Sequence, residues 1–580
     1  MIEFAKRWER SARARLAYAA SRVDHLAASP LSLIWQNYSA FAERYYDRIV
    51  IAATILALLI HAAIPSGPVS QNMMDLFTFI DGAYRIESGQ IPHVDFISSL
   101  GSGTYLIYVI ARQFVADGLL IFWSNLVFWV LCLPVVFWLP QILPASRALP
   151  VVVVAFVAVM IPVNIDFGFQ CGFNYNTGYN RWGAALLLLY FSSLFGRSRD
   201  LYSSPFVDAL VLVYAFLIKI NFFAVVAVAL VLLALLRGRN RIPALYAFGI
   251  FFLVLMGLEL GFSMVSGYFR DLGSVAAVNQ GAIVPMLMKA IRANLLQCIA
   301  MMLVILGLAL AALRPALDLF WRRPFSLGRA LVLARPNLLV GYVLTTSLVS
   351  ESQNLGGIGM VPALALLASG LPLPRLMPAF PWVILRTAVA ASILVPWLVI
   401  SAHNMGCLAK QVGLQRAQRS FTDIAPDFAS FAANQVYIAE QFNPEMLERE
   451  RRRRDWILHL DPRLYVFYMR EISDLLAVLR VNYSSPITRT LDFADPIPAL
   501  LGSKPARGSY IAMHHLRTIS PASYVAPDKL FAGVNLVLAP TCALFELNND
   551  MVKLYEPYLR QNFREVRLTR CWRAFERSTP

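Results

Sequence analysis

The stretch IVIAATILALLIHAAI, residues 49–64, is an apolar run that contains no acidic residue, lysine or arginine. A helix needs about 17–25 mostly apolar residues to cross the hydrocarbon core of a bilayer, so this run predicts the first membrane-spanning helix. Across the chain 58% of the residues are hydrophobic and 15% are charged. Soluble domains average about 45–50% apolar and about 25% charged residues. The composition therefore excludes a soluble enzyme, a disordered chain and a collagen-like fibre.

Further apolar runs follow the first one along the chain. They lie near 119–139, 148–163, 182–195, 204–219, 221–236, 243–262, 294–313, 336–350, 358–372 and 379–402. The segment 104–116 is shorter and contains Arg112 and Gln113, so we expect it to lie at the membrane interface rather than to cross. The basic residues between the runs can then all face the cytoplasm, as the positive-inside rule requires. The sequence predicts a polytopic α-helical membrane protein of about eleven transmembrane helices, with its N-terminus inside and its C-terminus outside.

The predicted chain has three parts. Residues 1–48 alternate basic and apolar side chains at helical spacing, which predicts an amphipathic helix on the cytoplasmic leaflet. Residues 49–402 form the multi-helix membrane domain, and residues 403–580 form a small α/β domain on the extracytoplasmic side. Within that domain the pattern predicts helices near 426–442, 445–458, 462–480 and 550–563, and strands near 509–514, 534–539 and 565–572.

The charge and the cysteines narrow the choice of partners. A net charge of +16 would suggest nucleic acid in a soluble protein. In a membrane protein, Lys and Arg held on the cytoplasmic side account for much of such an excess, so no nucleic-acid partner is predicted. The six cysteines and seven histidines show no metal-ligand spacing. A Cys542–Cys571 disulfide is expected only if the C-terminal region faces an oxidising compartment.

The first outer loop, residues 65–103, carries the candidate chemistry. From residue 73 to residue 103 it reads MMDLFTFIDGAYRIESGQIPHVDFISSLGSG. Apolar residues recur at helical spacing from Leu76 to Tyr84, which predicts a helix that follows Asp75. On this local pattern Asp75 is an N-cap that accepts hydrogen bonds from the first turn, and Asp95 is a turn residue.

The same loop resembles a family of membrane enzymes. It places Asp75, Ala83, Gly89, Pro92-His93-Val94-Asp95-Phe96 and Gly101 in the order seen in the GT-C class of glycosyltransferases. That class includes protein O-mannosyltransferases and lipid A aminoarabinose transferases, and its members move a sugar from a polyprenyl-phosphate lipid to an acceptor on the outer face. The stretch from Ala215 to Leu236, with one Lys between two apolar helices, resembles the class as well. The resemblance covers the membrane half of the chain.

The resemblance implies partners, a location and roles for individual residues. It implies a hexosyl- or pentosyltransferase of the bacterial inner membrane that uses a polyprenyl-phosphate-sugar donor, membrane lipids and a glycan, lipid or protein acceptor. Asp75 takes the role of general base, with Asp95 as a second catalytic carboxylate. The residues expected to bind substrate are His93, Lys219, Arg181 and Tyr84. No metal ligands are assigned: many relatives follow the first Asp with Glu, whereas Leu76 stands here, and a divalent-cation requirement is left open.

Each of these residues also has a structural interpretation. Lys219 is a charged residue in a costly apolar setting, which favours a functional role, but it can also snorkel to the outer surface. Arg181 can bind phosphate or form a solvated helix end, and His93 can be structural. Asp81 and Glu87 are expected to face solvent. Glu259 either pairs with another helix or lines the cavity.

Three other functions compete with the glycosyltransferase. A transporter or flippase of lipid-linked sugars usually shows repeated halves, which this sequence lacks. A ligase or polymerase of the O-antigen type also uses a polyprenyl lipid, but relies on a late loop rich in Arg and His. A receptor with an outer domain needs no acid in the first loop, so it would tolerate the loss of Asp75.

Overall fold

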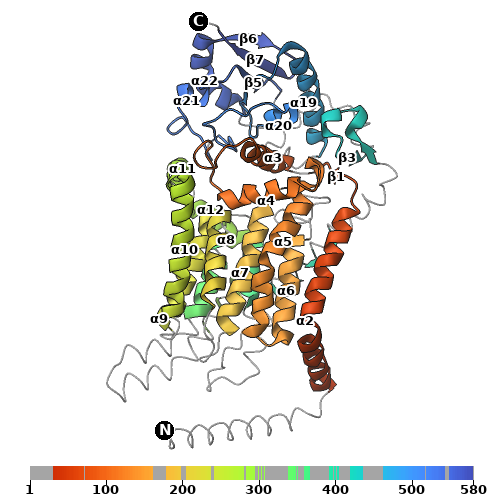
Figure 1. Cartoon of the computed structure of the whole chain (residues 1–580), viewed down its shortest axis with the longest axis vertical. Helices are drawn as coiled ribbons and strands as arrows, with labels where there is room; N and C mark the ends of the chain where they lie inside the picture. Colours follow the sequence, from red (N-terminus) through yellow and green to blue (C-terminus); the bar gives the residue numbers. More distant parts are fainter. Residues whose placement is uncertain are drawn as a thin grey trace, which may run out of the picture.

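The computed structural model describes residues 30–70, 72–160, 175, 178–196, 204–236, 241–279, 283–293, 338–347, 349–350, 358–365, 418–434, 462–515, 517–542 and 548–578, with scattered helical positions between 295 and 403. It shows a bundle of apolar helices with a compact α/β region at one end (Figure 1). The predicted amphipathic helix before residue 30, the predicted helix 445–458 and most of the last predicted spans lie outside the described residues.

The helix bundle follows the predicted apolar runs closely. Its helices are α2 (Pro30–Ala62), α5 (Leu120–Trp138), α6 (Ala145–Met160), α7 (Gly178–Gly196), α8 (Pro205–Ile218), α9 (Ile220–Leu236) and α10 (Arg241–Phe262). Three described segments are long and apolar enough to cross a membrane, Ile34–Ala62, Asp117–Gln141 and Arg241–Phe262. Shorter apolar helices pack between them, and the 3₁₀ helix Ile358–Leu364 packs against α7.

The first helix is longer than predicted. α2 begins at Pro30, whereas the apolar run begins at residue 49. The early turns of α2 contact the bundle, because the Tyr46 hydroxyl donates to the carbonyl of Val136 at 2.9 Å and the Glu43 carboxylate accepts from the amide of Ala145 at 2.9 Å. Tertiary contacts therefore extend the helix through a polar stretch that hydropathy alone assigns to a separate segment.

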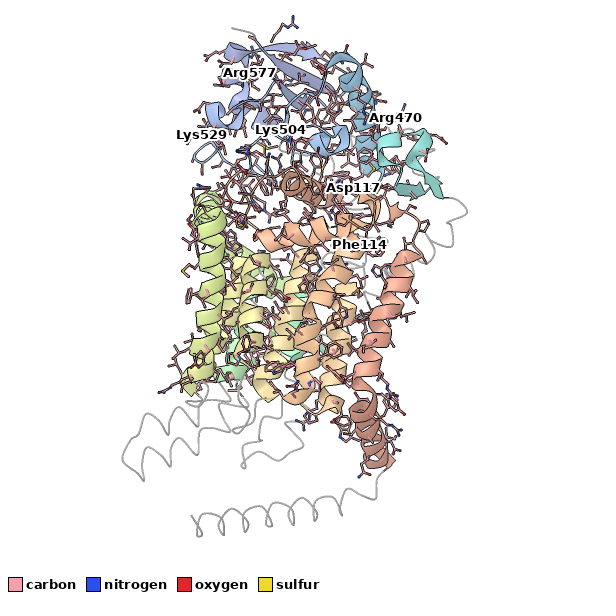
Figure 2. All side chains as sticks on the ribbon, in the orientation of Figure 1. Phe114, Asp117, Arg470, Lys504, Lys529 and Arg577 are labelled. Atoms are coloured by element: carbon pink, nitrogen blue, oxygen red, sulfur yellow. A yellow bond between two sulfur atoms is a disulfide. The ribbon has the colours of Figure 1, made fainter. Side chains whose placement is uncertain are left out.

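Two short helices lie across the end of the bundle that faces the α/β region. They are α3 (Met73–Glu87) and α4 (Ser102–Arg112), and Figure 1 shows α4 running across the bundle rather than along it. At 1.5 Å per residue, eleven residues reach about 16 Å, well short of a bilayer core of about 30 Å. Phe114 follows α4, is 64% exposed and stacks on Trp123, and Figure 2 shows it at the margin between the bundle and the α/β region. This placement agrees with the predicted interfacial segment 104–116.

A reporter enzyme fused after residue 117 is expected to report the outer side of the membrane. Since α4 does not cross, residue 117 stays on the same side as the first outer loop. Alkaline phosphatase activity measures this, and a matched fusion after Gly196, where Arg197 and Arg199 follow α7, is expected to be inactive. A cytoplasmic signal at residue 117 would contradict the topology.

The C-terminal region contains a four-stranded sheet. Its strands are β4 (Thr488–Thr490), β5 (Leu536–Pro540), β6 (Phe563–Arg567) and β7 (Trp572–Arg577), in the order β4-β5-β7-β6. β4 is parallel to β5, and the other neighbours are antiparallel. Leu536 and Leu538 belong to the core that contains α19 (Pro462–Asn482), while Val537 and Ala539 pack with α22 (Asn548–Asn562). The buried β5 thus has helices on both faces, and short helices α20 (Ile497–Leu501) and α21 (Pro527–Leu530) complete the region.

Several local predictions for this region are wrong. The predicted strand 565–572 covers the end of β6, a turn and the first residue of β7, because a hairpin joins two strands there. The start of the predicted helix 426–442 is instead a 3₁₀ turn, Pro426–Phe428, followed by strand β3 (Phe431–Asn434). The predicted strand 509–514 is no strand: it pairs with the first outer loop, where the amide of Ile97 donates to the carbonyl of Ser509 at 2.8 Å.

The first outer loop and the C-terminal region are joined by backbone pairing. β1 (Gly67–Pro68) pairs in parallel with β3, and β3 pairs with β2 (Gln418–Ser420). Helix α3 of this loop packs against α4 on one side and against α20 on the other, where Phe77 also meets Tyr468 of α19. Cys542 follows β5 and Cys571 precedes β7, and the two form a disulfide at the ends of these central strands. The loop that carries Asp75 is therefore enclosed by the C-terminal region.

Candidate functional site

Asp75 lies inside the first turn of α3 rather than at its N-cap. Asn72 occupies the N-cap with a left-handed backbone (φ 53°), and the amide of Asp75 donates to the carbonyl of Asn72 at 3.2 Å. The carboxylate is partly buried at the N-terminal end of the helix, where the helix dipole favours its ionised form. The buried phenol of Tyr465, from α19, is hydrogen-bonded to the backbone amides of Met73 and Met74. It also lies close enough to Asp75 to interact with its charge.

Aromatic side chains line the space beside Asp75. Phe79 of α3 stacks on Tyr108 of α4, with ring centroids 4.5 Å apart, and meets Tyr179 edge-on at 6.1 Å. Burial raises the pKa of Tyr108, the charge of Arg181 acts in the opposite direction, and the charge of Asp75 raises this pKa further. The Tyr108 phenol therefore lies within electrostatic reach of both Asp75 and Arg181.

Arg181 is buried, so its interpretation as a solvated helix end is wrong. It stands in the first turn of α7 and is 3% exposed. A Cβ on Gly178 would lie 3.8 Å from the Tyr108 hydroxyl and 3.9 Å from Arg181 Nη2, so these two polar groups flank the same small space. The same Cβ would lie 3.1 Å from the Ile121 side chain. Glycine at position 178 therefore lets the first turn of α7 pack closely against α5.

Lys219 points into the bundle rather than toward the outer surface. It separates α8 from α9, its Nζ donates to Asn180 Oδ1 at 3.5 Å, and it lies 5.4 Å from the centroid of the Tyr179 ring. An ammonium over an aromatic face is attracted by the ring quadrupole. Lys219 therefore contacts the first turn of α7, the turn that also carries Arg181.

The structure thus brings three predicted residues together at the outer end of the bundle. We call this group, Asp75, Tyr108, Tyr179, Arg181 and Lys219, the outer site. It combines one carboxylate with two cations among buried and half-buried aromatic side chains. A carboxylate in such a setting suits proton acceptance, and the cations suit an anionic group such as a phosphate.

The other predicted residues lie outside the outer site. Asp95 accepts a hydrogen bond from the amide of Ile91 at 2.9 Å and pairs with Arg507 at 3.3 Å, so it stabilises its own loop and the C-terminal contact. The Tyr84 hydroxyl donates to the carbonyl of Ser503 at 3.0 Å. His93 is buried against α11 (Met264–Val278), with Nδ1 2.9 Å from the carboxylate of Asp271.

Three further acidic residues of the predicted bundle and loop, Asp81, Glu87 and Glu259, also lie outside the outer site. Asp81 is 1% exposed and pairs with Arg85, so the expectation that it faces solvent is wrong, although the i,i+4 spacing of the pair was a signal for this contact. Glu87 is exposed, as the sequence predicts, and its carboxylate pairs with Arg112. Glu259 pairs with another helix, as one of its two interpretations stated: its carboxylate, on α10, accepts from the amides of Val265 and Ser266 and caps α11.

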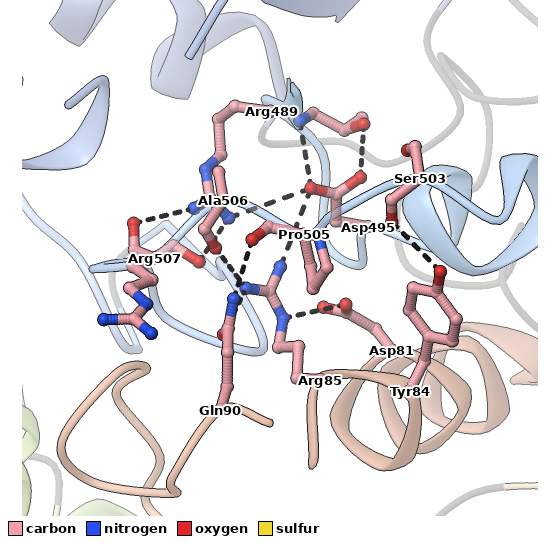
Figure 3. Close-up of polar contacts among 12 residues, drawn as sticks. Asp81, Tyr84, Arg85, Gln90, Arg489, Asp495, Ser503, Pro505, Ala506 and Arg507 are labelled. Carbon is pink, nitrogen blue, oxygen red and sulfur yellow. Dashed lines mark hydrogen bonds and ion pairs between the residues drawn. The ribbon is translucent and has the colours of Figure 1, made fainter. Parts of the chain in front are cut away.

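A buried polar network joins α3 to the C-terminal region (Figure 3). Arg85 contacts Asp81 at 2.8 Å and Asp495 at 3.9 Å, and Arg489 contacts Asp495 at 3.8 Å. Gln90 donates to the carbonyl of Pro505 at 2.7 Å. We call the five side chains Asp81, Arg85, Gln90, Arg489 and Asp495 the interdomain network. Burial raises the pKa of Asp81 to about 7, with the Arg85 charge acting in the opposite direction, and burial with the repulsion of Arg85 lowers the pKa of Arg489 to about 10.

The described residues contain no group of three or more His, Cys, Asp or Glu side chains that would hold a metal ion. A hollow of about 390 Å³ lies on the other side of α3, between Phe77, Arg112, Asp117, Phe428 and Leu500. It includes no member of the outer site.

Comparison with known proteins gives few relatives. No protein-family model matches the chain, and no curated protein matches it in sequence. Among solved structures, the chain is similar to the crystal structure of ArnT from Cupriavidus metallidurans in the apo state. The identity is 12%, the TM-score is 0.35, and the match covers 91% of this chain and 97% of that one.

Proposed function

We propose that this protein is a membrane glycosyltransferase that moves a sugar from a polyprenyl-phosphate-linked donor to a glycan, lipid or protein acceptor on the extracytoplasmic face. The observation that carries the proposal is the outer site. A carboxylate, Asp75, and two cations, Arg181 and Lys219, meet where an amphiphilic donor can present its headgroup from the membrane. The GT-C-like pattern of the first outer loop supports the same function.

The residues fit an inverting transfer. The acceptor oxygen attacks the anomeric carbon of the sugar and forms the new glycosidic bond, while the bond between that carbon and the phosphate oxygen breaks. Asp75 takes the proton of the acceptor hydroxyl. The polyprenyl phosphate leaves with the electron pair of the broken bond, and Arg181 and Lys219 stabilise its charge.

The proposed location is an integral position in a bacterial inner membrane, with the C-terminal domain outside. The apolar helices support the membrane location. The Cys542–Cys571 disulfide supports the outer placement of the C-terminal region, since disulfides persist in oxidising compartments. The outer site then opens on the side where lipid-linked sugars are used by the GT-C class.

The rival functions make different demands on the outer site. A transporter of lipid-linked sugars would move the donor without breaking its bond to phosphate, so it has no use for a base at position 75. An O-antigen-type ligase or polymerase would require a glycan acceptor. Release of free polyprenyl phosphate by the purified protein distinguishes the glycosyltransferase from a transporter, which leaves the donor intact. The identity of the acceptor distinguishes it from an O-antigen-type ligase or polymerase, which requires a glycan.

The Lys219→Gln variant is expected to raise the KM for the donor about 10–100-fold, because it removes a charge-assisted contact worth about 1.5–3 kcal/mol. The assay follows a radiolabelled sugar from polyprenyl phosphate into product with purified protein in lipid nanodiscs. Lys529→Gln is the matched control, because Lys529 is exposed on the C-terminal region (Figure 2). Equal KM values for both variants would remove Lys219 from donor binding, and no transfer by the wild-type protein would contradict the proposed function.

A further inference from the structure

The helix break at Lys219 leaves peptide groups that need partners outside α8 and α9. α8 ends at Ile218 and α9 begins at Ile220, while Lys219 between them is extended, with φ −165° and ψ 133°. In a continuous helix the amide of Ile220 would donate to the carbonyl of Phe216, four residues earlier. The break removes that bond. A buried peptide group is nearly always paired, so another element has to supply the partner.

Two other elements supply these partners. The Tyr268 hydroxyl of α11 accepts from the amide of Ile220 at 3.0 Å. On the other side of the break, the carbonyl of Ile218 accepts from the amide of Gly101 at 2.9 Å and from the Thr104 hydroxyl at 3.2 Å. A side chain at position 101 would come within 2.2 Å of the Leu217 carbonyl, so glycine permits this approach. The peptide units on both sides of Lys219 are therefore held from outside their own helices.

Tyr268 is itself held firmly. It is 2% exposed, and its ring lies 4.5 Å from the ring of His93 and 5.4 Å from that of Phe216. His93 has a left-handed backbone, with φ 67°, which costs a non-glycine residue energy. The carboxylate of Asp271 contacts the His93 ring, and Arg270 donates to the His93 carbonyl at 2.6 Å. Contacts from α11 thus keep the strained His93 against Tyr268.

We propose that Tyr268 is a positioning residue for Lys219. Its hydroxyl takes the place of the Phe216 carbonyl as the partner of the Ile220 amide and so fixes the turn at Lys219 between α8 and α9, which pack side by side. This directs the ammonium toward Asn180 and the first turn of α7. Without the hydroxyl, the Ile220 amide loses its partner at this turn and Lys219 is no longer held toward Asn180. The inference rests on the proposed function for the role of Lys219 in donor binding, but the position of Lys219 is a separate and measurable quantity.

The test uses the Tyr268→Phe variant of the full-length protein, which removes one oxygen and preserves the ring. The first readout is the rate at which an amine-acetylating reagent modifies Lys219, measured by mass spectrometry. We expect this rate to rise about fivefold, because a neutral hydrogen bond of ordinary strength is lost. The second readout is sugar transfer, in which the KM for the donor is expected to rise about fivefold with little change in kcat.

Two further variants make the test specific. Tyr524→Phe removes a phenol that is 39% exposed in the C-terminal region, and it is expected to change neither readout. Thr104→Val removes one of two donors to Ile218 and is expected to give a smaller rise than Tyr268→Phe. Unchanged Lys219 modification in Tyr268→Phe would overturn the inference, whether or not the protein transfers sugar. Absence of transfer in the wild-type protein would overturn the proposed function, and Lys219 modification would then decide the inference alone.

Discussion

The Asp75→Asn variant is expected to transfer sugar about 10²–10⁴ times more slowly than the wild-type protein, which is the usual contribution of a positioned general base. Asparagine has nearly the same shape as aspartate but cannot take the proton of the acceptor hydroxyl. The KM for the donor should change little, because the phosphate contacts are assigned to Arg181 and Lys219. Initial rates with the radiolabelled donor measure both parameters.

The control for this variant is Asp550→Asn. Asp550 is the third residue of α22, as Asp75 is the third residue of α3, so both substitutions remove an acid from the first turn of a helix. Each changes the interaction with the helix dipole by at most about 1 kcal/mol. A loss of transfer that is confined to Asp75→Asn identifies chemistry rather than helix stability. Equal rates for Asp75→Asn and the wild type would remove Asp75 from catalysis.

The Arg85→Met variant is expected to lose about 3–5 kcal/mol of stability, the usual cost of breaking a buried ion pair by removing one partner. Arg85 is fully buried, and it contacts the carboxylates of Asp81 and Asp495 as well as the ring of Phe96. Methionine fills much of the volume but leaves Asp81 buried without its counter-charge. Thermal unfolding of the purified protein in detergent measures the loss.

Two comparisons separate this effect from a general effect of losing an arginine. Arg560→Met breaks an exposed i,i+4 pair with Glu556 on α22 and is expected to change the unfolding temperature little. The double variant Asp81→Asn with Arg85→Met is expected to be more stable than Arg85→Met alone, since it removes the uncompensated charge. If Arg85→Met is no less stable than Arg560→Met, the interdomain network does not hold α3 to the C-terminal region.

Both predictions concern the same helix. α3 carries Asp75 in its first turn and Arg85 in its last, and most of its side chains are buried between the bundle and the C-terminal region. The C-terminal region therefore contacts the helix that carries Asp75, for example through Tyr465 at the amides of Met73 and Met74.

The sequence by itself determined the helical membrane architecture of the described bundle. Apolar length decides where a helix can cross a bilayer, and this property is read along a single stretch of chain. For the same reason, the short segment 104–116 was recognised as interfacial, and the helices α5 to α10 begin and end near the predicted runs. Lys219 was also identified from the sequence, because a charge in an apolar setting is conspicuous there, whereas Asp75 was singled out by the resemblance of its loop to the GT-C class.

Only the tertiary structure decided which of these residues meet. Asp75, Arg181 and Lys219 are far apart in the chain, and no periodicity states that α3, the start of α7 and the α8–α9 break lie together. Asp81 looks like a surface residue until Asp495 and Arg489, from the other end of the chain, are seen to bury it. Likewise, the pairing of residues 508–511 with the first outer loop replaced a predicted strand, because backbone hydrogen bonds are satisfied by whichever segment the fold brings near. Hydropathy depends on local composition, whereas pairing between distant charges depends on packing that only the folded chain creates.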